Sequence, residues 1–198
     1  MAGKVTVVTA GYGDIGRAIC RRFCQEGGTV VMTGRKGDEE GSAVARATQT
    51  GGGTIEYLRC DAGDRPSIDA MFQEVLQRHP RIDVVIGNAA MVENSPFLDI
   101  RPDQWQAHLD LNLTGNFHVG QAAARIMVEQ EPAKKPGCER GVRGKILFKL
   151  VGPRPGSDPP ASEARDNLFD LRLLDEGLAV DEEVILRADG RPAFQGQP

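Results

Sequence analysis

The residues with the clearest chemical potential lie near the start of the chain, in the run Gly11-Tyr12-Gly13-Asp14-Ile15-Gly16. This run matches GxGxxG, and it follows an apolar β-branched segment and opens an amphipathic one, which is the context that the pattern requires. Gly11 would permit a tight turn, Gly13 would let the backbone approach a pyrophosphate, and Gly16 would let a helix close onto a strand. Free N–H groups at the helix start would then face the anion, so the sequence predicts a bound dinucleotide.

Two alternatives accompany this interpretation. The run could be a glycine-rich turn that binds nothing. Asp14 also stands in the first helical turn, where its carboxylate would either compete with a phosphate for the N–H groups or point to solvent.

The choice of dinucleotide is decided at the end of the next β-branched run, which reads Met32-Thr33-Gly34-Arg35-Lys36. An acidic residue at this place would hold a ribose 2′-hydroxyl group, and none is present. Arg35 and Lys36 stand where a 2′-phosphate would sit, which favours NADP over NAD. The alternative is that both are solvated loop charges.

No metal site is predicted. The four cysteines contain no CxxC pair, and the three histidines, His79, His108 and His118, show no HExxH pattern and no carboxylate at ligand spacing. Cys20 and Cys24 lie one helical turn apart, as small buried helix residues do.

Short β-branched runs alternate with longer amphipathic stretches along the first three quarters of the chain. Strands are expected at 5–9, 29–33, 54–59, 82–86 and 145–150, and helices at 15–26, 39–48, 67–78 and 104–129. This alternation predicts an α/β fold with a doubly wound parallel sheet joined by right-handed crossovers. Residues 131–144 are expected to form an exposed connection.

Composition limits the class of protein and its partners. The chain has 198 residues with 40% hydrophobic and 26% charged residues, as a soluble globular protein does, and 24 glycines, roughly 12% against a usual ~7%. The net charge of −4 gives no basic field for nucleic acid or an anionic membrane. The absence of a long apolar run predicts a cytoplasmic protein without a membrane anchor.

Several separate motifs in a fixed order resemble the short-chain dehydrogenase/reductase family over about residues 1–150. In the family's TGxxxGxG loop, Thr9 matches the threonine, Ala10 replaces the first glycine, Asp14 replaces the middle glycine and Gly16 keeps the last. Gly87-Asn88-Ala89-Ala90 is similar to the family's NNAG motif with both outer residues changed.

Two further segments carry the resemblance. Cys60-Asp61-Ala62 is similar to the place where the family's aspartate contacts the adenine ring, and Asn112-Leu113-Thr114-Gly115 to the helix motif whose asparagine orders a proton-relay water. The resemblance implies a Rossmann-like fold and cofactor contacts from Thr9, Gly11 to Gly16, Arg35, Asp61, Ala62 and Asn88 to Ala90. It implies a catalytic role for Asn112.

The family's acid and base are missing from this chain. Its mechanism uses a tyrosine whose pKa is lowered by a lysine four residues later, together with a serine after the fifth strand. Tyr12 and Tyr57 are the only tyrosines, and their i+4 residues are Gly16 and Asp61. The segment after the fifth strand reads Lys149-Leu150-Val151-Gly152, without serine.

The resemblance ends near residue 150, which predicts a nucleotide-binding domain at 1–151 and a Pro/Gly-rich linker with an acidic tail at 152–198. The tail holds five arginines against ten acidic residues. Within it, a short helix at 168–178 and a hairpin at 184–194 are expected. The sheet is expected to be incomplete on its C-terminal side, as in a truncated or altered chain.

Three functions follow. The resemblance implies an NADP-dependent oxidoreductase that moves hydride between NADP and a small-molecule carbonyl or secondary alcohol whose identity stays open. The empty catalytic positions favour a nucleotide-binding pseudoenzyme that acts as an interaction partner. A Rossmann-like methyltransferase is the third, and the Asn88 and Asn112 motifs argue against it. A homo-oligomer through the long central helix is also expected.

Overall fold

The computed structural model describes residues 1–93, 95–135 and 138–149. By contacts, the chain divides into two units: Met1–Glu131 with Arg143–Val151 form one, and Pro132–Val142 belong to the other. The first unit carries the sheet and the candidate site. The predicted tail at 152–198, with its helix and hairpin, lies outside the described residues.

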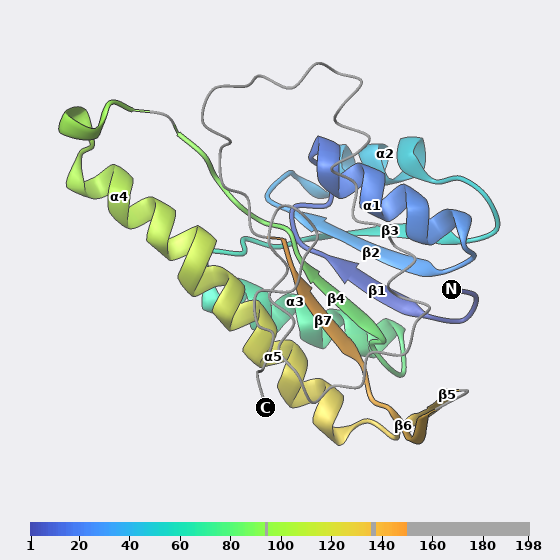
Figure 1. Ribbon diagram of the computed structural model, residues 1–198. Coiled ribbons are helices and arrows are strands. Elements are labelled where there is room, and N and C mark those ends of the chain that lie inside the picture. Colours follow the sequence, from blue (N-terminus) through green and yellow to red (C-terminus); the bar gives the residue numbers. More distant parts are fainter. Residues whose placement is uncertain (94, 136–137, 150–198) are drawn as a thin grey trace, which may run out of the picture. The chain divides into compact units, whose positions relative to one another are not determined.

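Five parallel strands form the central sheet in the order β3-β2-β1-β4-β7 (Figure 1). They are β1 (Val5–Val8), β2 (Thr29–Gly34), β3 (Thr54–Arg59), β4 (Val84–Gly87) and β7 (Lys145–Phe148). All five were predicted from the β-branched runs, within one to two residues at their ends. The doubly wound α/β fold is therefore confirmed.

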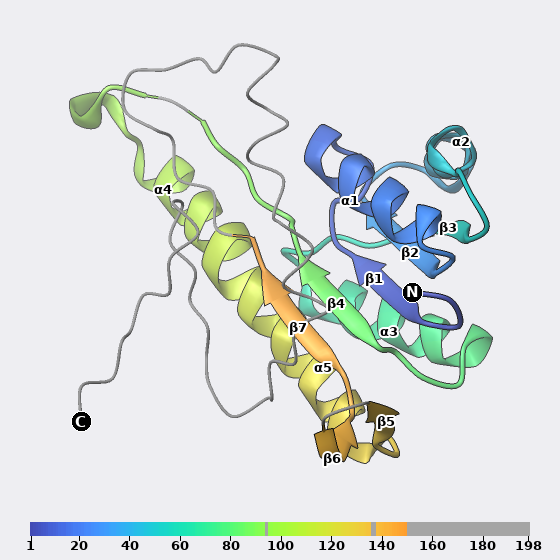
Figure 2. The same cartoon turned by 45° about the vertical axis from the view of Figure 1, so that its right-hand side comes forward.

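Helices cover both faces of the sheet. The helices α1 (Asp14–Gln25) and α2 (Asp38–Thr48) lie on one face, and α3 (Arg65–Arg78) and α5 (Asn116–Glu129) lie on the other (Figures 1 and 2). Local signals begin α3: Asp64 caps it by accepting the Ser67 N–H at 3.0 Å, and Pro66 lies in its first turn.

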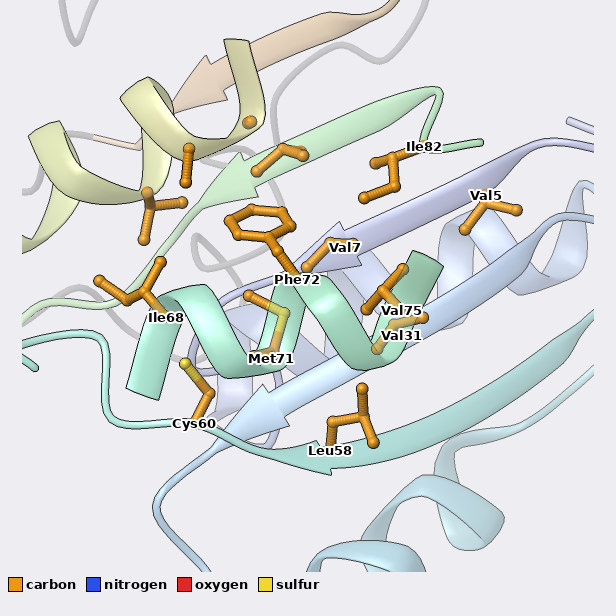
Figure 3. Close-up of a cluster of buried hydrophobic side chains, with 14 of the residues drawn as sticks. Val5, Val7, Val31, Leu58, Cys60, Ile68, Met71, Phe72, Val75 and Ile82 are labelled. Carbon is orange, nitrogen blue, oxygen red and sulfur yellow. The ribbon is translucent and has the colours of Figure 1, made fainter. Parts of the chain in front are cut away.

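The core lies between the sheet and the α3/α5 face. Figure 3 shows Phe72 and Met71 of α3 lying against Val7 and Val31 of the strands, all at most 2% exposed. The inner strands β1, β2 and β4 are buried on both faces, so they read as runs of apolar and β-branched residues, whereas the edge strands β3 and β7 are partly exposed. Within the described residues, no helix is both long enough and apolar enough to cross a bilayer.

The predicted helix at 104–129 is longer and less regular than expected. It consists of α4 (Pro102–Leu109), a π-helical segment η2 (Asp110–Gly115) and α5, preceded by a short 3-10 turn η1 (Phe97–Asp99). Pro102 occupies the first helical position, where its missing N–H costs nothing. The start two residues earlier therefore follows ordinary capping rules.

The expectation of a plain connection at 131–144 is wrong. In the second unit, β5 (Ala133–Lys135) and β6 (Cys138–Val142) pair antiparallel, with an irregular register between Ala133 and Lys135. Gly141 adopts a φ of +70°, a conformation that few other residues accept. The strands are only three and five residues long and carry no alternating apolar pattern, so periodicity gave no signal for them.

Candidate functional site

The crevice for a ligand is set by the order of the strands. The chain leaves β1 through α1 toward β2 and arrives in β4 through α3, on the opposite face, although β1 and β4 are neighbours. In doubly wound sheets, ligands bind beyond the carboxyl ends of the strands at this reversal. The glycine loop, residues 9–13, and the segment after β4, residues 88–93, flank that position.

Gly11 and Gly16 serve packing within the loop. A Cβ atom on Gly11 would lie 2.7 Å from Met32 Cγ, and one on Gly16 would overlap the Ala10 carbonyl and lie 2.7 Å from Gly11 Cα. The tight turn predicted for Gly11 is made by its neighbour, because Ala10 holds a φ of +48°. Ala10 stands where the family has a glycine, so here an alanine accepts the left-handed conformation.

Gly13 behaves differently, since the nearest atom to a Cβ built there is the Ala10 carbonyl oxygen at 3.6 Å. Gly13 caps α1 and supplies no side-chain hydrogen bond to the first turn. The first N–H groups of α1 thus lack a side-chain acceptor, and the open cradle beside Gly13 fits the pyrophosphate of a dinucleotide.

Asp14 does not compete for those N–H groups. Its side chain is 94% exposed and pairs with Arg17 at 2.7 Å on the outside of the helix. Ile15 beside it is half exposed. Of the two orientations left open for Asp14 by the sequence, the structure shows the one toward solvent.

Thr9 and Asn88 connect the ends of β1 and β4 rather than facing outward. The Thr9 hydroxyl donates to the Ile86 carbonyl at 3.3 Å and accepts the N–H groups of Asn88 at 2.8 Å and Ala89 at 2.9 Å. The Asn88 amide donates to the carbonyls of Thr9 at 3.0 Å and Ala10 at 3.2 Å. Asn88 Oδ1 is buried and has no partner among the described residues.

Asn112 holds the segment that follows β4. Its Oδ1 accepts the Met91 N–H and its Nδ2 donates to the Met91 carbonyl, both at 2.8 Å, as a neighbouring β-strand would. One turn later, Asn116 Nδ2 donates to the Ala89 carbonyl at 3.2 Å and the Asn112 carbonyl at 2.9 Å. Asn112 therefore lies in η2, at the site, and its side chain is committed to positioning the backbone.

Arg35 and Lys36 follow β2 as predicted, and their surroundings differ. Arg35 is exposed and makes no hydrogen bond or ion pair within the described part of the chain. Lys36 forms an ion pair with Glu40 and lies 5.5 Å from the centre of the Tyr12 ring. The Tyr12 ring packs on Gly34, where any Cβ atom would collide with it. Of these two cations, Arg35 is thus the one available to a ligand.

The remaining predicted residues flank the site. Asp61 Oδ1 accepts the Gly63 N–H at 3.0 Å, and Asp61 is half-buried. Ala62 is buried, with its carbonyl against Gly115 of η2, and Ala90 is exposed after β4. These contacts place Asp61 at the end of β3, beyond the end of β2 that carries Arg35.

Neither tyrosine is positioned as a base. Tyr12 lies in the glycine loop against Gly34. The Tyr57 hydroxyl is 2.8 Å from both the Gly34 and Lys36 carbonyl oxygens, and burial raises the pKa of Tyr57 to about 12. A phenol in this state donates a hydrogen bond and holds its proton at neutral pH.

One open concavity of about 650 Å³ lies at the other end of the sheet, between the C-terminal ends of α3 and α5. Leu76, Arg81, Ile126 and Gln130 are among the residues around it. It includes no predicted site residue, so the site is defined by the strand ends and not by this hollow. Within the described residues, no group of three His, Cys, Asp or Glu side chains gathers as metal ligands do.

Three residues at the site were not singled out from the sequence. Asn116 stands four residues after Asn112, a spacing that places both on one helix face and could have revealed it. Met91 acts through its backbone, for which the sequence holds no signal. Lys149 follows β7, where its N–H bonds to the Gly87 carbonyl at 2.9 Å, beside Asn88.

Comparisons with known proteins agree with this geometry. A 3beta-hydroxysteroid dehydrogenase of Mediterraneibacter gnavus is 33% identical over 125 residues, which are 63% of this chain and 45% of that protein. A short-chain type dehydrogenase/reductase of Mycobacterium marinum superposes with a TM-score of 0.65 at 26% identity, covering 74% of this chain and 55% of its own. The NADPH-dependent 3-quinuclidinone reductase of Rhodotorula rubra gives 0.60 at 25% identity, over 75% and 52%.

The chain thus spans about half the length of the dehydrogenase that it matches. Residues 4–134 match the family model described as short chain dehydrogenase. This match covers the glycine loop, the segment after β4 and the asparagine helix. The chain belongs to the short chain dehydrogenase family.

Proposed function

We propose that this protein binds NADP(H) at the carboxyl edge of the sheet, between β1 and β4. The observation that carries the proposal is the α1 N-terminus, which has no side-chain cap and opens beside the cradle at Gly13. Helix N–H groups and the positive end of the helix dipole stabilise a pyrophosphate there.

Arg35 supports NADP over NAD as the cofactor. It follows β2 at the edge where a ribose 2′-phosphate would lie, and its guanidinium has no partner within the described residues. A planar guanidinium binds a phosphate through two parallel hydrogen bonds. The name of the Rhodotorula rubra reductase includes NADPH dependence, which agrees with this choice.

The reaction proposed is hydride transfer between NADP and a carbonyl or secondary alcohol. The nicotinamide would supply the hydride. The chain's own residues provide a rigid floor: Thr9 and Asn88 fix the strand ends, and Asn112 and Asn116 fix residues 89–91 above them. A floor held by this many hydrogen bonds keeps a bound ring in one orientation.

A second candidate is a nucleotide-binding protein that acts through its partners and not through catalysis. It rests on one specific observation, that no tyrosine of the 198 residues is followed four positions later by lysine. General acid–base help contributes about 10² to 10⁴-fold to such reactions, so its loss would leave hydride transfer slow.

The test is a calorimetric titration of the purified protein with NADPH and NADH, followed by an assay of NADPH oxidation on a panel of ketones and aldehydes. We expect NADPH to bind more tightly than NADH and at least one carbonyl to be reduced. Binding without turnover would favour the second candidate. Failure of both dinucleotides to bind would refute the proposed function.

We also propose that two copies of the chain associate through the long helix. Four large apolar side chains on α4, η2 and α5 are 57–66% exposed: Trp105, Leu113, Phe117 and Val128. A row of this kind on one helix is typical of a protein interface, since isolated apolar residues are scattered on ordinary surfaces.

A further inference from the structure

Lys149, like Arg35, is a cation at the site whose charge no described residue balances. It follows β7, is half-buried, and forms no ion pair or side-chain hydrogen bond with any residue of 1–93, 95–135 or 138–149. A lysine that loses solvent without gaining a carboxylate is costly to bury. Such cost is typical of functional positions.

The register fixes where Lys149 lies. Gly87 pairs with Phe148, and the Lys149 N–H continues the ladder by bonding to the Gly87 carbonyl at 2.9 Å. Lys149 therefore stands beside Asn88, the residue that forms the floor of the site. It lies at the carboxyl ends of the strands, the edge that also carries the start of α1.

The alternation of side chains fixes the face. Ile146 packs against the core cluster under α3 and α5, and the Phe148 ring lies against Gly120 of α5. Since successive side chains of a strand point to opposite faces, the alternation directs Lys149 away from α5. Figures 1 and 2 show that α1 covers that opposite face of the sheet. The start of α1 and Lys149 thus share one face and one edge of the sheet.

The charged groups of the elements beside β7 lie elsewhere. β4 itself carries no charged residue, and Asp83, which precedes it at the opposite end, pairs with Lys4 and Arg81 at 2.9 Å. On α5 they are His118, Arg125 and Glu129, on the other face of the sheet. Burial lowers the pKa of Lys149, which moves the ammonium toward the range where it can release a proton.

We propose that Lys149 is a catalytic residue, the proton donor to the carbonyl oxygen in the reductive direction. This inference rests on the proposed function. The carbonyl carbon receives hydride, with its electron pair, from C4 of the reduced nicotinamide, which is oxidised. The C=O π electrons move to oxygen, a Lys149 N–H bond breaks and an O–H bond forms. The neutral amine that remains takes a proton from water.

The chain offers a matched control. Lys145 lies four residues earlier on the same strand and the same face, at the amino end and far from the site. Lys149→Ala removes the amine, Lys149→Arg keeps the positive charge but holds its proton at any usable pH, and Lys145→Met removes a comparable side chain elsewhere.

The first readout does not need turnover. NMR of the lysine side-chain amines, with the Lys149 signal identified by its loss in Lys149→Arg, is recorded as pH rises, with and without NADPH. We expect the Lys149 signal to titrate below the other lysines and to shift when NADPH is added, while the Lys145 signal stays. A Lys149 signal that ignores NADPH, in protein that calorimetry shows to bind it, overturns this inference and leaves the proposed function standing.

The second readout is the reduction of a ketone by NADPH. We expect Lys149→Ala and Lys149→Arg both to lose at least ~100-fold in turnover with NADPH affinity unchanged, and added methylammonium to restore part of the Lys149→Ala activity. Lys145→Met is expected to keep full activity. Full activity in Lys149→Arg would mean that only the positive charge of Lys149 matters, and it would overturn the inference. Unchanged activity in Lys149→Ala would overturn it as well. Absence of NADPH binding in the unmodified protein refutes both proposals together.

Discussion

Asn88 donates two hydrogen bonds to Thr9 across the ends of β1 and β4, one from its backbone and one from its side chain. The Thr9 hydroxyl accepts the Asn88 N–H at 2.8 Å, and the Asn88 side chain donates to the Thr9 carbonyl at 3.0 Å. With the Ala89 N–H and the Ile86 carbonyl, the Thr9 hydroxyl uses its one donor and both acceptor positions. These contacts define the strand ends on which a cofactor would rest.

Replacing Thr9 tests this connection. Thr9→Val keeps the shape but leaves the N–H groups of Asn88 and Ala89 buried without an acceptor, so we expect a loss of about 2–4 kcal/mol in the free energy of unfolding. Urea denaturation measures it. Thr9→Ser keeps the hydroxyl and should lose much less, and equal losses in the two variants would show that packing, not hydrogen bonding, matters here.

Substitutions of two glycines, Gly16 and Gly13, test the stability of the fold and the binding of NADPH separately. Gly16→Ala places a methyl group against Ala10 and Gly11, so it should cost about 1–3 kcal/mol of stability. Gly13→Ala meets only the Ala10 carbonyl at 3.6 Å, so the free protein should keep its stability while NADPH binding weakens at least ~10-fold. Thermal unfolding and calorimetry on both variants decide, and a Gly13→Ala protein that binds NADPH normally would contradict the cradle.

Arg35 is expected to set the cofactor preference. Arg35→Ala should weaken NADPH binding about 10-fold and leave NADH binding unchanged, because only NADPH carries the 2′-phosphate. Lys36→Ala is the control, and its effect should be smaller since Lys36 is engaged by Glu40 and the Tyr12 ring. An equal loss for NADH and NADPH in Arg35→Ala would argue against this role.

Buried thiols make the fold sensitive to alkali. Burial raises the pKa of Cys20 to about 12 and of Cys60 to about 11, against 9.0 for an exposed thiol. The unfolded chain releases these protons first, so stability is complete below pH 9 and falls as pH rises toward 11 and 12. At pH 10, each thiol lowers the free energy of unfolding by about 1.4 kcal/mol relative to its value at pH 8.

Urea unfolding at pH 8 and pH 10 measures this loss. The difference between the free energies of unfolding at pH 8 and pH 10 should shrink by about 1.4 kcal/mol in Cys20→Ala. It should shrink by about twice that amount when Cys60→Ala is added. Baseline stability will fall as well, so only the difference is compared. An unchanged difference would mean that the thiols ionise in the folded protein as easily as in the unfolded one.

The exposed apolar row on the long helix predicts association. Phe117, at 60% exposed, lies within it, so Phe117→Glu should turn a dimer into a monomer in light scattering without lowering thermal stability. Phe97→Glu is the matched control, because Phe97 is 86% exposed in η1, outside the row, and should leave the mass unchanged. A monomer in the unmodified protein would refute the oligomer.

The residue pattern was sufficient for the inner strands β1, β2 and β4 because they are buried on both faces. Runs such as Val5–Val8 stand out when every residue is apolar or β-branched, and α3 has its own cap in Asp64. The hairpin at Ala133–Lys135 and Cys138–Val142 lacks such a pattern. Its pairing depends on backbone groups, which the residue types do not show.

The sequence could propose residues for the candidate site, but not the contacts that those residues make. Motif spacing identified Thr9, Asn88 and Asn112 as site residues, yet predicted contacts with a cofactor or water, whereas their side chains bind one another's backbones or that of Met91. The Thr9 hydroxyl bonds to residues that are 77 to 80 positions away in the sequence. These hydrogen bonds can form only because β1 and β4 pair. For the same reason Lys149, placed beside Asn88 by β7, was not visible as a site residue.

The π-helical segment Asp110–Gly115 controls how α4 and α5 are turned relative to each other. A π turn accommodates one residue more than an α turn, and one residue corresponds to about 100° of rotation. Removing a single residue here would let the helix continue regularly, but would swing Val119, Ala123 and Met127 away from the sheet. The length of this short segment is therefore under stricter constraint than its partly exposed side chains suggest.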